Sequence, residues 1–271
     1  MEKRKLDRLS GILRDMGSAV LAYSGGVDSS FLLKVIKLAG IKSLAVTGDS
    51  ETMPFDDLRD AATVASGCGM DHRVIMTDEL KNEDFLRNTP MRCFHCKDML
   101  FGRLKAIALM EGYNFVIDGS TTDDTEDFRP GRDAGIRHGV RSPLQEAGFT
   151  KQEIRKESKR MGLPTWDKPS SPCLGSRFPY GVRITAGALR RVSQAERFLK
   201  TLGLRELRVR HLGDEARIEI PEKDIARALD PEVRGSIVRE LKSLGYRFVS
   251  LDLEGFRSGK MGVPAGGDKN I

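Results

Sequence analysis

The chain lacks the long apolar segments that membrane proteins need. No run reaches the roughly 18 apolar residues of a membrane span, and the first residues, MEKRKLD, contain no apolar core of a secretory signal. With 39% hydrophobic and 31% charged residues among 271, the composition is that of a globular protein with one large or two modest domains. We therefore expect a cytoplasmic protein that has no membrane partner.

Cysteine and aromatic residues are also scarce. Four cysteines occur, and in a cytoplasmic chain they are not expected to form a disulfide framework. Aromatic residues make up 6% and gather into no stripe with basic ones, although the net charge is +6 and the pI is near 9.2. Basic and acidic residues are interleaved throughout. An anionic small substrate accounts for this balance as well as RNA does, and we do not expect a nucleic-acid partner.

The Walker A pattern GxxxxGK[ST] is absent, but the chain has another glycine-rich turn. Residues 24–29 read SGGVDS and lie between an apolar strand-like run, 19–23, and a helical run, 30–39. Such a turn exposes backbone N–H groups at the positive end of a helix, and its glycines let the backbone approach an anion closely. The form resembles the pyrophosphate loop of the PP-loop ATP pyrophosphatases. We predict an ATP site formed by Ser24, Gly25, Gly26, Asp28 and Ser29.

Asp28 has two interpretations. Its carboxylate could help to hold Mg²⁺ at the phosphates, because Mg²⁺ prefers a few carboxylates together with phosphate oxygens. Alternatively, it is an acidic residue that the dipole stabilises at the start of a helix.

The region from 18 to 150 alternates short apolar runs with helical ones. Strands are expected at 19–23, 43–47, 72–76 and 115–119, and helices at 3–16, 30–39, 55–66 and 99–110. This order predicts an α/β fold, a doubly wound parallel sheet, in which ligands bind outside the carboxyl ends of the strands. Further nucleotide contacts are therefore predicted at Thr47, Asp49, Ser50, Asp118, Gly119 and Asp124, with Arg129 placed to meet an anion.

Proline marks a boundary in the chain. Four prolines fall within 164–179, so this stretch is neither a regular helix nor a central strand. We expect a PP-loop domain over 1–165, a proline-rich active-site loop over 166–183 that carries Cys173, and a small α+β domain over 184–271. That last domain is expected to have helices near 186–202 and 222–244, the second with a break near 230–231, and strands near 206–211, 216–220 and 247–253.

The spacing of three cysteines has several interpretations. Cys93 and Cys96 form a CxxC, and Cys173 lies in the proline-rich loop. Three thiolates from two loops could hold three irons of a [4Fe–4S] cluster and leave the fourth iron open. His95 could instead complete a zinc site, or the CxxC could be purely structural. Cys68 has no partner in the sequence and is expected to be a small packed residue.

Several blocks together resemble one family. They are SGGVDS, AVTGDS, DGSTTDD with FRPGRDAG, SPLQEAG with KQEIR, PTWDKPSSPCLGSRFPYG and ELRVRHLGDEARIEI. Together they are similar to LarE, the PP-loop sulfur insertase of nickel-pincer nucleotide biosynthesis, over about residues 5 to 255. The CLGSRFPYG and RVRHLG…ARIEI blocks are much more specific than SGGxDS, which alone indicates only the superfamily.

The resemblance implies an ATP-dependent sulfur transferase. Its substrate is pyridinium-3,5-biscarboxylic acid mononucleotide or the half-thiolated form, whose carboxylate is adenylated and then converted to a thiocarboxylate. The implied catalytic residues are Cys173, Asp28 and Glu196, and the implied substrate or phosphate ligands are Ser176, Arg177, Arg208 and Arg210. Glu196 alternatively is a solvated helix charge, while Arg208 and Arg210 share one strand face and suit a phosphate. The family also implies a homo-oligomer, with hexamers known.

Two sulfur sources are known in this family. In some members the cysteine at the Cys173 position gives up its own sulfur and becomes dehydroalanine. Members with counterparts of Cys93 and Cys96 carry a three-cysteine [4Fe–4S] cluster instead, and we favour this source for the present chain. The sulfur would then come from sulfide or from a cysteine desulfurase.

Other functions stay open on the sequence alone. A tRNA thiolase of the PP-loop class also combines a CxxC, one further cysteine and a [4Fe–4S] cluster, but the chain has no zinc ribbon or RNA-binding appendage. The chain could also be an amide-forming PP-loop synthetase, but it has no glutaminase segment, and its cysteines would then have no role. A nucleotide-binding regulator that senses iron is the non-enzymatic alternative.

Overall fold

The structure is a computed structural model that describes residues 2–54, 56–125 and 130–256. The chain forms two compact units, each with a sheet of its own. The first comprises residues 1–79 and 91–171, and the second comprises residues 80–90 and 172–271.

The first unit is built on a four-stranded parallel sheet. Its strands are β1 (Ser18–Ala22), β2 (Lys42–Asp49), β3 (His72–Met76) and β4 (Phe115–Ile117), in the order β3-β2-β1-β4. The helices are α1 (Glu2–Met16), α2 (Val27–Ala39), α3 (Asp57–Gly67), α5 (Arg92–Glu111), α6 (Pro130–His138), α7 (Pro143–Glu146) and α8 (Lys151–Arg160). A short 3₁₀ turn forms η2 (Thr122–Thr125), and another, η1 (Glu79–Lys81), begins at the last residue of the segment 1–79.

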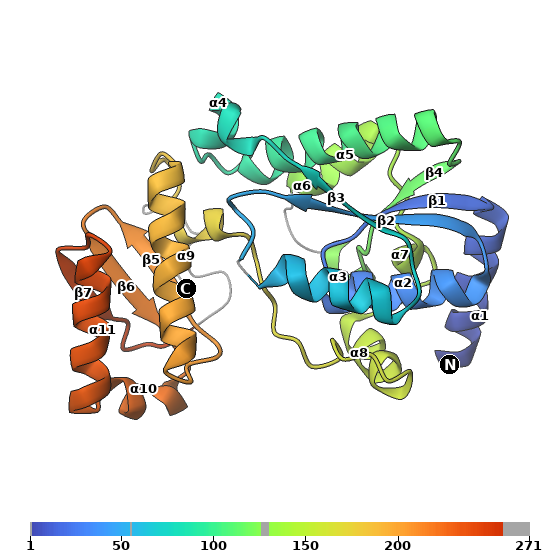
Figure 1. The fold of residues 1–271 in the computed structure, drawn as a ribbon. Coiled ribbons are helices and arrows are strands. Elements are labelled where there is room, and N and C mark those ends of the chain that lie inside the picture. The colour runs from blue at the N-terminus through green and yellow to red at the C-terminus, as the bar shows by residue number, and fades with distance from the viewer. Residues whose placement is uncertain (1, 55, 126–129, 257–271) are drawn as a thin grey trace, which may run out of the picture. The chain divides into compact units, whose positions relative to one another are not determined.

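Helices cover both faces of this sheet (Figure 1). Successive residues of a strand point to opposite faces. On β1, Ala19 and Leu21 pack with α1, α2 and α3, whereas Val20 packs with Phe101 of α5 and with α6. The two apolar clusters explain why the strands are nearly continuous in apolar residues. The prediction of a doubly wound α/β sheet is confirmed.

The second unit is a smaller α+β assembly. A mixed sheet contains β5 (Arg208–Leu212), β6 (Glu215–Glu219) and β7 (Phe248–Leu251), with β5 and β6 antiparallel and β6 and β7 parallel. The accompanying helices are α4 (Glu83–Leu86), η3 (Leu174–Arg177), α9 (Ala186–Thr201), α10 (Glu222–Leu229) and α11 (Pro231–Ser243). Side chains of α9, α10 and α11 pack with β5 and β6 in one core. The break between α10 and α11 falls at Asp230, as the following proline predicts.

One predicted boundary was wrong in a way that matters for the cysteines. The helix expected at 99–110 begins at Arg92, so Cys93 and Cys96 lie in its first turns rather than in a loop. Pro90 shortly precedes this helix, where a proline is compatible with a helix start. Within the described ranges, none of the helices combines the length and the apolarity that crossing a bilayer requires.

Candidate functional site

The glycine-rich turn joins β1 to the N-terminus of α2. Gly25 has φ of +68°, and a Cβ there would lie 2.7 Å from the Cβ of Ala61 on α3. Only glycine therefore fits where the turn crosses α3. Gly26 is the N-cap of α2, and no side chain caps this helix end. The first-turn N–H groups thus face a place where an anion can bind.

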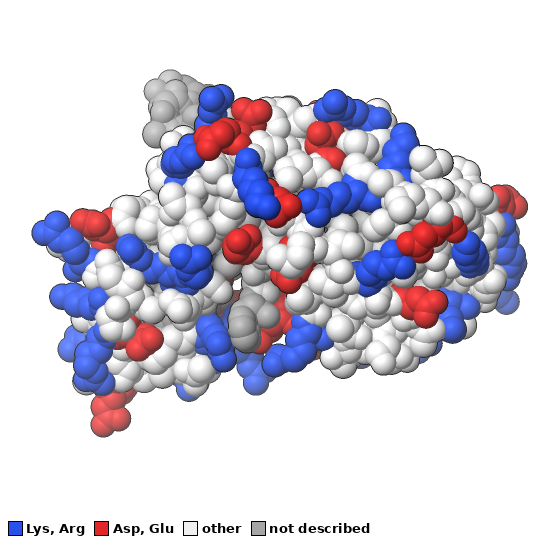
Figure 2. Space-filling model, turned by 45° about the horizontal axis from the view of Figure 1, so that its top comes forward, with Lys and Arg blue, Asp and Glu red and all other residues white. Residues whose placement is uncertain are grey.

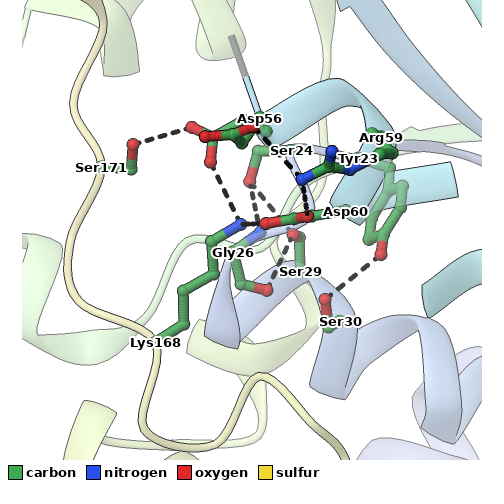
Figure 3. Close-up of polar contacts among 11 residues, drawn as sticks. Tyr23, Ser24, Gly26, Ser29, Ser30, Asp56, Arg59, Asp60, Lys168 and Ser171 are labelled. Atoms are coloured by element: carbon green, nitrogen blue, oxygen red, sulfur yellow. Dashed lines mark hydrogen bonds and ion pairs between the residues drawn. The ribbon is translucent and has the colours of Figure 1, made fainter. Parts of the chain in front are cut away.

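Two serine hydroxyls hold the turn in shape (Figure 3). The Oγ atoms of Ser24 and Ser29 lie 3.1 Å apart, and Ser24 Oγ accepts a hydrogen bond from the Gly26 N–H at 3.4 Å. Beneath the turn, the Tyr23 hydroxyl pairs with Ser30 Oγ at 3.2 Å, and burial raises the pKa of Tyr23 to about 12. The turn is therefore preorganised by its own short side chains.

The loop after β4 lies against the same helix end. A Cβ on Gly119 would lie 3.1 Å from the backbone nitrogen of Ser29, so this close approach also needs glycine. Asp118 accepts hydrogen bonds from Ser142 Oγ at 2.7 Å and from Ser120 Oγ at 2.8 Å, which stabilises the loop. The sheet order changes direction between β1 and β4, and ligands of such sheets bind at this point.

Asp28 lies in a charged environment at the start of α2. Burial is the main cause that raises its pKa to about 6, and the cations Lys151 and Arg155 oppose this shift. Asp124 raises the pKa further, although its own carboxylate pairs with Lys151 Nζ at 2.8 Å. Ionising the Asp28 carboxylate is costly because it is buried. A bound cation or a polar ligand would offset that cost.

The raised pKa makes stability depend on pH in a defined direction. The folded protein binds the Asp28 proton more tightly than the unfolded chain does, so the stability gained by protonation is present below about pH 4 and lost as the pH rises through about 6. Without nucleotide or metal, Asp28→Asn is expected to be about 2 kcal/mol more stable than wild type at pH 7.5 and to converge with it near pH 4. Urea unfolding across this pH range measures the difference. Exposed Asp71→Asn is the control and should stay within about 0.5 kcal/mol, whereas a destabilised Asp28→Asn at pH 7.5 would contradict the expectation.

The other predicted nucleotide contacts follow β2. Thr47 is buried, and its Oγ1 donates to the Tyr23 carbonyl at 2.7 Å and lies 2.8 Å from His72 Nε2. The Asp49 carbonyl accepts the Thr77 N–H, while Ser50 Oγ contacts Thr52 Oγ1 at 2.7 Å. Arg129 lies outside the described residues. The structure thus brings together the loops after β1 and β4. The Thr47 hydroxyl is already engaged in hydrogen bonds inside the protein.

Cys93 and Cys96 share one face at the start of α5. They are three residues apart in a helix, which brings side chains together. Both are free thiols, Cys93 exposed and Cys96 half-buried. Arg92 Nη2 lies 3.8 Å from Cys93 Sγ, and Cys96 Sγ donates to the buried Glu79 Oε1 at 3.5 Å. Among the residues that the structure describes, no three histidine, cysteine, aspartate or glutamate side chains are grouped to hold a metal.

The remaining two cysteines differ. Cys68 packs against the core of the first unit, where burial raises the pKa of its thiol, so its predicted packing role is confirmed. Cys173 is the N-cap of η3 in the second unit and is half-buried. Its carbonyl accepts the Ser176 N–H at 3.0 Å, which turns the chain toward Arg177.

A buried cluster of charges follows Cys173 in the second unit. Arg177 makes a two-pronged ion pair with Glu196 of α9, at 2.7 and 3.0 Å, and donates to Ser176 Oγ at 2.9 Å. Glu196 Oε1 also accepts the Val209 N–H at 3.0 Å. The structure therefore brings together residues from η3, α9 and β5 that are far apart in the sequence.

Arg210 and Arg208 complete this cluster. Arg210 donates to Glu219 Oε2 and to the Ser176 carbonyl, both at 2.7 Å, while its buried Nε has no hydrogen-bond partner among the described residues. Arg208 stacks on Phe256 at 4.4 Å and pairs with no carboxylate in that part of the chain. Burial, followed by the charges of Arg177 and Arg210, lowers the pKa of Arg208 to about 10. Three guanidinium groups thus share two carboxylates, and the excess positive charge suits an anion.

Sequence reasoning missed four charged residues that touch these sites. Glu219 pairs with Arg210 across the β5–β6 hairpin, whose turn at Gly213 and Asp214 could have indicated the pairing. Lys151 and Arg155 of α8 act on Asp28, and the capping box TKQE marks the start of this helix in the sequence but not its approach to Asp28. Nothing in the sequence indicates that Glu79 contacts Cys96.

The distribution of charge on the surface is relevant to whether the protein binds nucleic acid. On the face shown in Figure 2, lysine and arginine side chains are interspersed with aspartate and glutamate. Many of the basic groups are neutralised in exposed pairs, such as Arg73 with Glu111 and Arg183 with Glu83. Exposed pairs of this kind reduce the excess of positive charge on the surface.

Comparison with known proteins found close relatives along almost the full length. An uncharacterized protein of Synechocystis sp. is 41% identical over 262 residues, which cover 96% of this chain and 98% of that protein. Pyridinium-3,5-bisthiocarboxylic acid mononucleotide synthase of Lactiplantibacillus plantarum is 38% identical over 255 residues, covering 93% and 92%. An uncharacterized protein of Methanocaldococcus jannaschii is 28% identical over 258 residues, covering 94% and 98%. No protein-family model matches the chain.

Proposed function

The chain belongs to the LarE family of PP-loop sulfur-inserting enzymes, and from this premise we propose that it converts pyridinium-3,5-biscarboxylic acid mononucleotide to its thiocarboxylate with consumption of ATP. The observation that carries the proposal is the 38% identity, over 93% of the chain, with the synthase named for the bisthiocarboxylic product. The uncapped start of α2 would serve as a nucleotide-phosphate site, and the arginine cluster would serve as a second anion site.

The reaction has two steps that these residues would serve. First, a substrate carboxylate oxygen attacks the α-phosphorus of ATP, which forms the acyl adenylate and releases pyrophosphate. Ser24, Gly25, Gly26 and the first turn of α2 would bind the departing pyrophosphate, with Asp28 holding Mg²⁺. Second, a sulfur nucleophile attacks the activated carbonyl, AMP leaves with the C–O electron pair, and the thiocarboxylate forms. AMP is a much better leaving group than the oxide of a free carboxylate.

The arginine cluster would bind the phosphate of the substrate. Arg208 has no ion-pair partner among the described residues, and the buried Nε of Arg210 is a second unused donor. Glu196 holds Arg177 in place with both of its oxygens. Charge-assisted hydrogen bonds from buried guanidinium groups bind phosphate strongly and in a defined orientation.

Cys93, Cys96 and Cys173 would hold a [4Fe–4S] cluster that supplies the sulfur as a bound sulfide. Donor chemistry supports this assignment, because Cys93 and Cys96 are free thiols on one helix face and Cys173 is a third. Sulfide or a cysteine desulfurase would replenish the sulfur, and we expect the enzyme to work as a homo-oligomer.

Metal analysis of protein purified without oxygen tests the sulfur source. We expect about four irons and at least four sulfides per wild-type chain, with loss of iron in Cys93→Ala. Cys68→Ala is the matched control, because Cys68 packs against the core, and it should retain the iron. Iron-free wild type that turns over once while Cys173 loses the mass of H₂S would instead identify sacrificial sulfur. Zinc in place of iron would contradict both sources.

A further inference from the structure

Lys168 lies on the segment that leads from α8 to Cys173, and two carboxylates of α3 hold its ammonium. Its Nζ lies 3.1 Å from Asp57 Oδ1 and 3.4 Å from Asp60 Oδ2. The Lys168 side chain is 19% exposed, so its ammonium is largely withdrawn from water. Ser171 Oγ also donates to Asp57, at 2.7 Å. The segment 164–171 is hereafter called the strap.

The strap and the glycine-rich turn rest on the same part of α3. Gly25 meets Ala61, the residue directly after Asp60. Figure 3 shows the Lys168 side chain pointing toward Ser24 and Gly26, with the carboxylate of Asp60 beside them. The lysine therefore lies next to the place where the uncapped N–H groups of α2 would receive a phosphate.

The backbone of the strap is tied down independently of the Lys168 side chain. Arg155 donates to the Trp166 carbonyl and to the Lys168 carbonyl, both at 2.9 Å. The side chain itself borders a cleft of about 370 Å³ between α3 and the strap, so its ammonium has room to move. An ammonium on a flexible stem can thus change partners while its backbone stays in place.

The charges at this point are unfavourable for an anion unless the lysine takes part. Asp57 and Asp60 would repel a polyphosphate bound at the glycine-rich turn, and Lys168 is a cation that pairs with both of them. Arg59 contacts Asp56 and Asp60, but its side chain is 73% exposed, where such pairs are weak.

We propose that Lys168 binds the pyrophosphate part of the nucleotide, and that Asp57 and Asp60 hold its ammonium beside the glycine-rich turn when no nucleotide is bound. This assignment rests on the proposed ATP-dependent function and adds a ligand to it. Because Lys168 is five residues before Cys173 in the chain, nucleotide binding would also act on the segment that leads to the reactive cysteine.

Titration calorimetry of the full chain with ATP, inorganic pyrophosphate and AMP, each with Mg²⁺, tests the proposal. Lys168→Met should weaken ATP and pyrophosphate binding about tenfold to a hundredfold and leave AMP binding within about twofold. Lys168→Arg should recover most of the loss. Lys37→Met is the control, because Lys37 is a lysine of the same unit that lies on an exposed face and donates to the Gly69 carbonyl rather than to a carboxylate.

Asp60→Asn distinguishes a phosphate ligand from a simple tether. If Lys168 changes partners, removing one carboxylate leaves ATP binding unchanged or tighter, because the ammonium loses a competitor. If Lys168 only ties the strap to α3, Asp60→Asn and Lys168→Met weaken ATP and AMP alike, which would overturn the proposal. Unchanged pyrophosphate binding by Lys168→Met would also overturn it. Wild type that binds neither ATP nor pyrophosphate would overturn the ATP-dependent function together with this proposal.

Discussion

Replacing Cys173 by alanine is expected to abolish thiocarboxylate formation while ATP activation of the substrate continues. Both sulfur sources need this thiol, either as an iron ligand or as the sulfur itself. The glycine-rich turn belongs to the other unit, and the hydrogen bonds that shape it are made by its own serines. Product formation should therefore fall below about 1% of wild type, while pyrophosphate exchange stays within about threefold.

Substrate-dependent exchange of labelled pyrophosphate into ATP measures the first step, and mass spectrometry of the thiocarboxylate measures the whole reaction. Cys68→Ala, which changes a packed thiol of the first unit, should keep both activities. A Cys173→Ala protein with more than a few per cent of wild-type product would exclude Cys173 from both roles. Loss of exchange as well would mean that Cys173 is needed for activation.

Replacing Glu196 by glutamine is expected to destabilise the protein by about 3 to 5 kcal/mol. The change keeps the shape of the side chain but leaves Arg177, which is 4% exposed, without its carboxylate. Arg208 and Arg210 are close enough to affect each other, so the loss leaves three buried guanidinium groups with Glu219 alone. Breaking a buried pair is costly because the remaining charge is neither solvated nor neutralised.

Urea unfolding measures this loss, with a surface pair as the comparison. Glu83→Gln breaks the exposed pair with Arg183 and should cost less than about 1 kcal/mol. Inorganic phosphate should stabilise Glu196→Gln more than wild type, because an anion can replace the missing carboxylate. Equal costs for Glu196→Gln and Glu83→Gln would contradict the buried-pair interpretation, and equal phosphate effects would contradict an open anion site.

The first unit was predicted well because its signals are local. A buried parallel strand followed by a glycine-rich turn and an apolar-periodic helix is recognisable within some twenty residues. The position of β3, and in the second unit that of the break at Asp230, needed no knowledge of distant residues. The start of α5 was missed, because the apolar periodicity of that helix is weak around Cys93 and Cys96. The roles of the nucleotide-site residues stay predictions.

The sequence alone therefore determined the succession of strands and helices in the first unit, the glycine-rich turn and the alternation that turns Arg208 and Arg210 to one side of β5. Only the tertiary structure decided which distant residues pair. It places Glu219 against Arg210 and Lys151 near Asp28, and it pairs Lys168 with Asp57 and Asp60. It also decided that residues 80–90 pack with the second unit, where Asn88 donates to the Pro179 carbonyl at 2.7 Å. Local pattern follows from backbone geometry, whereas these pairings depend on how separate elements pack, and sequence spacing does not encode that packing.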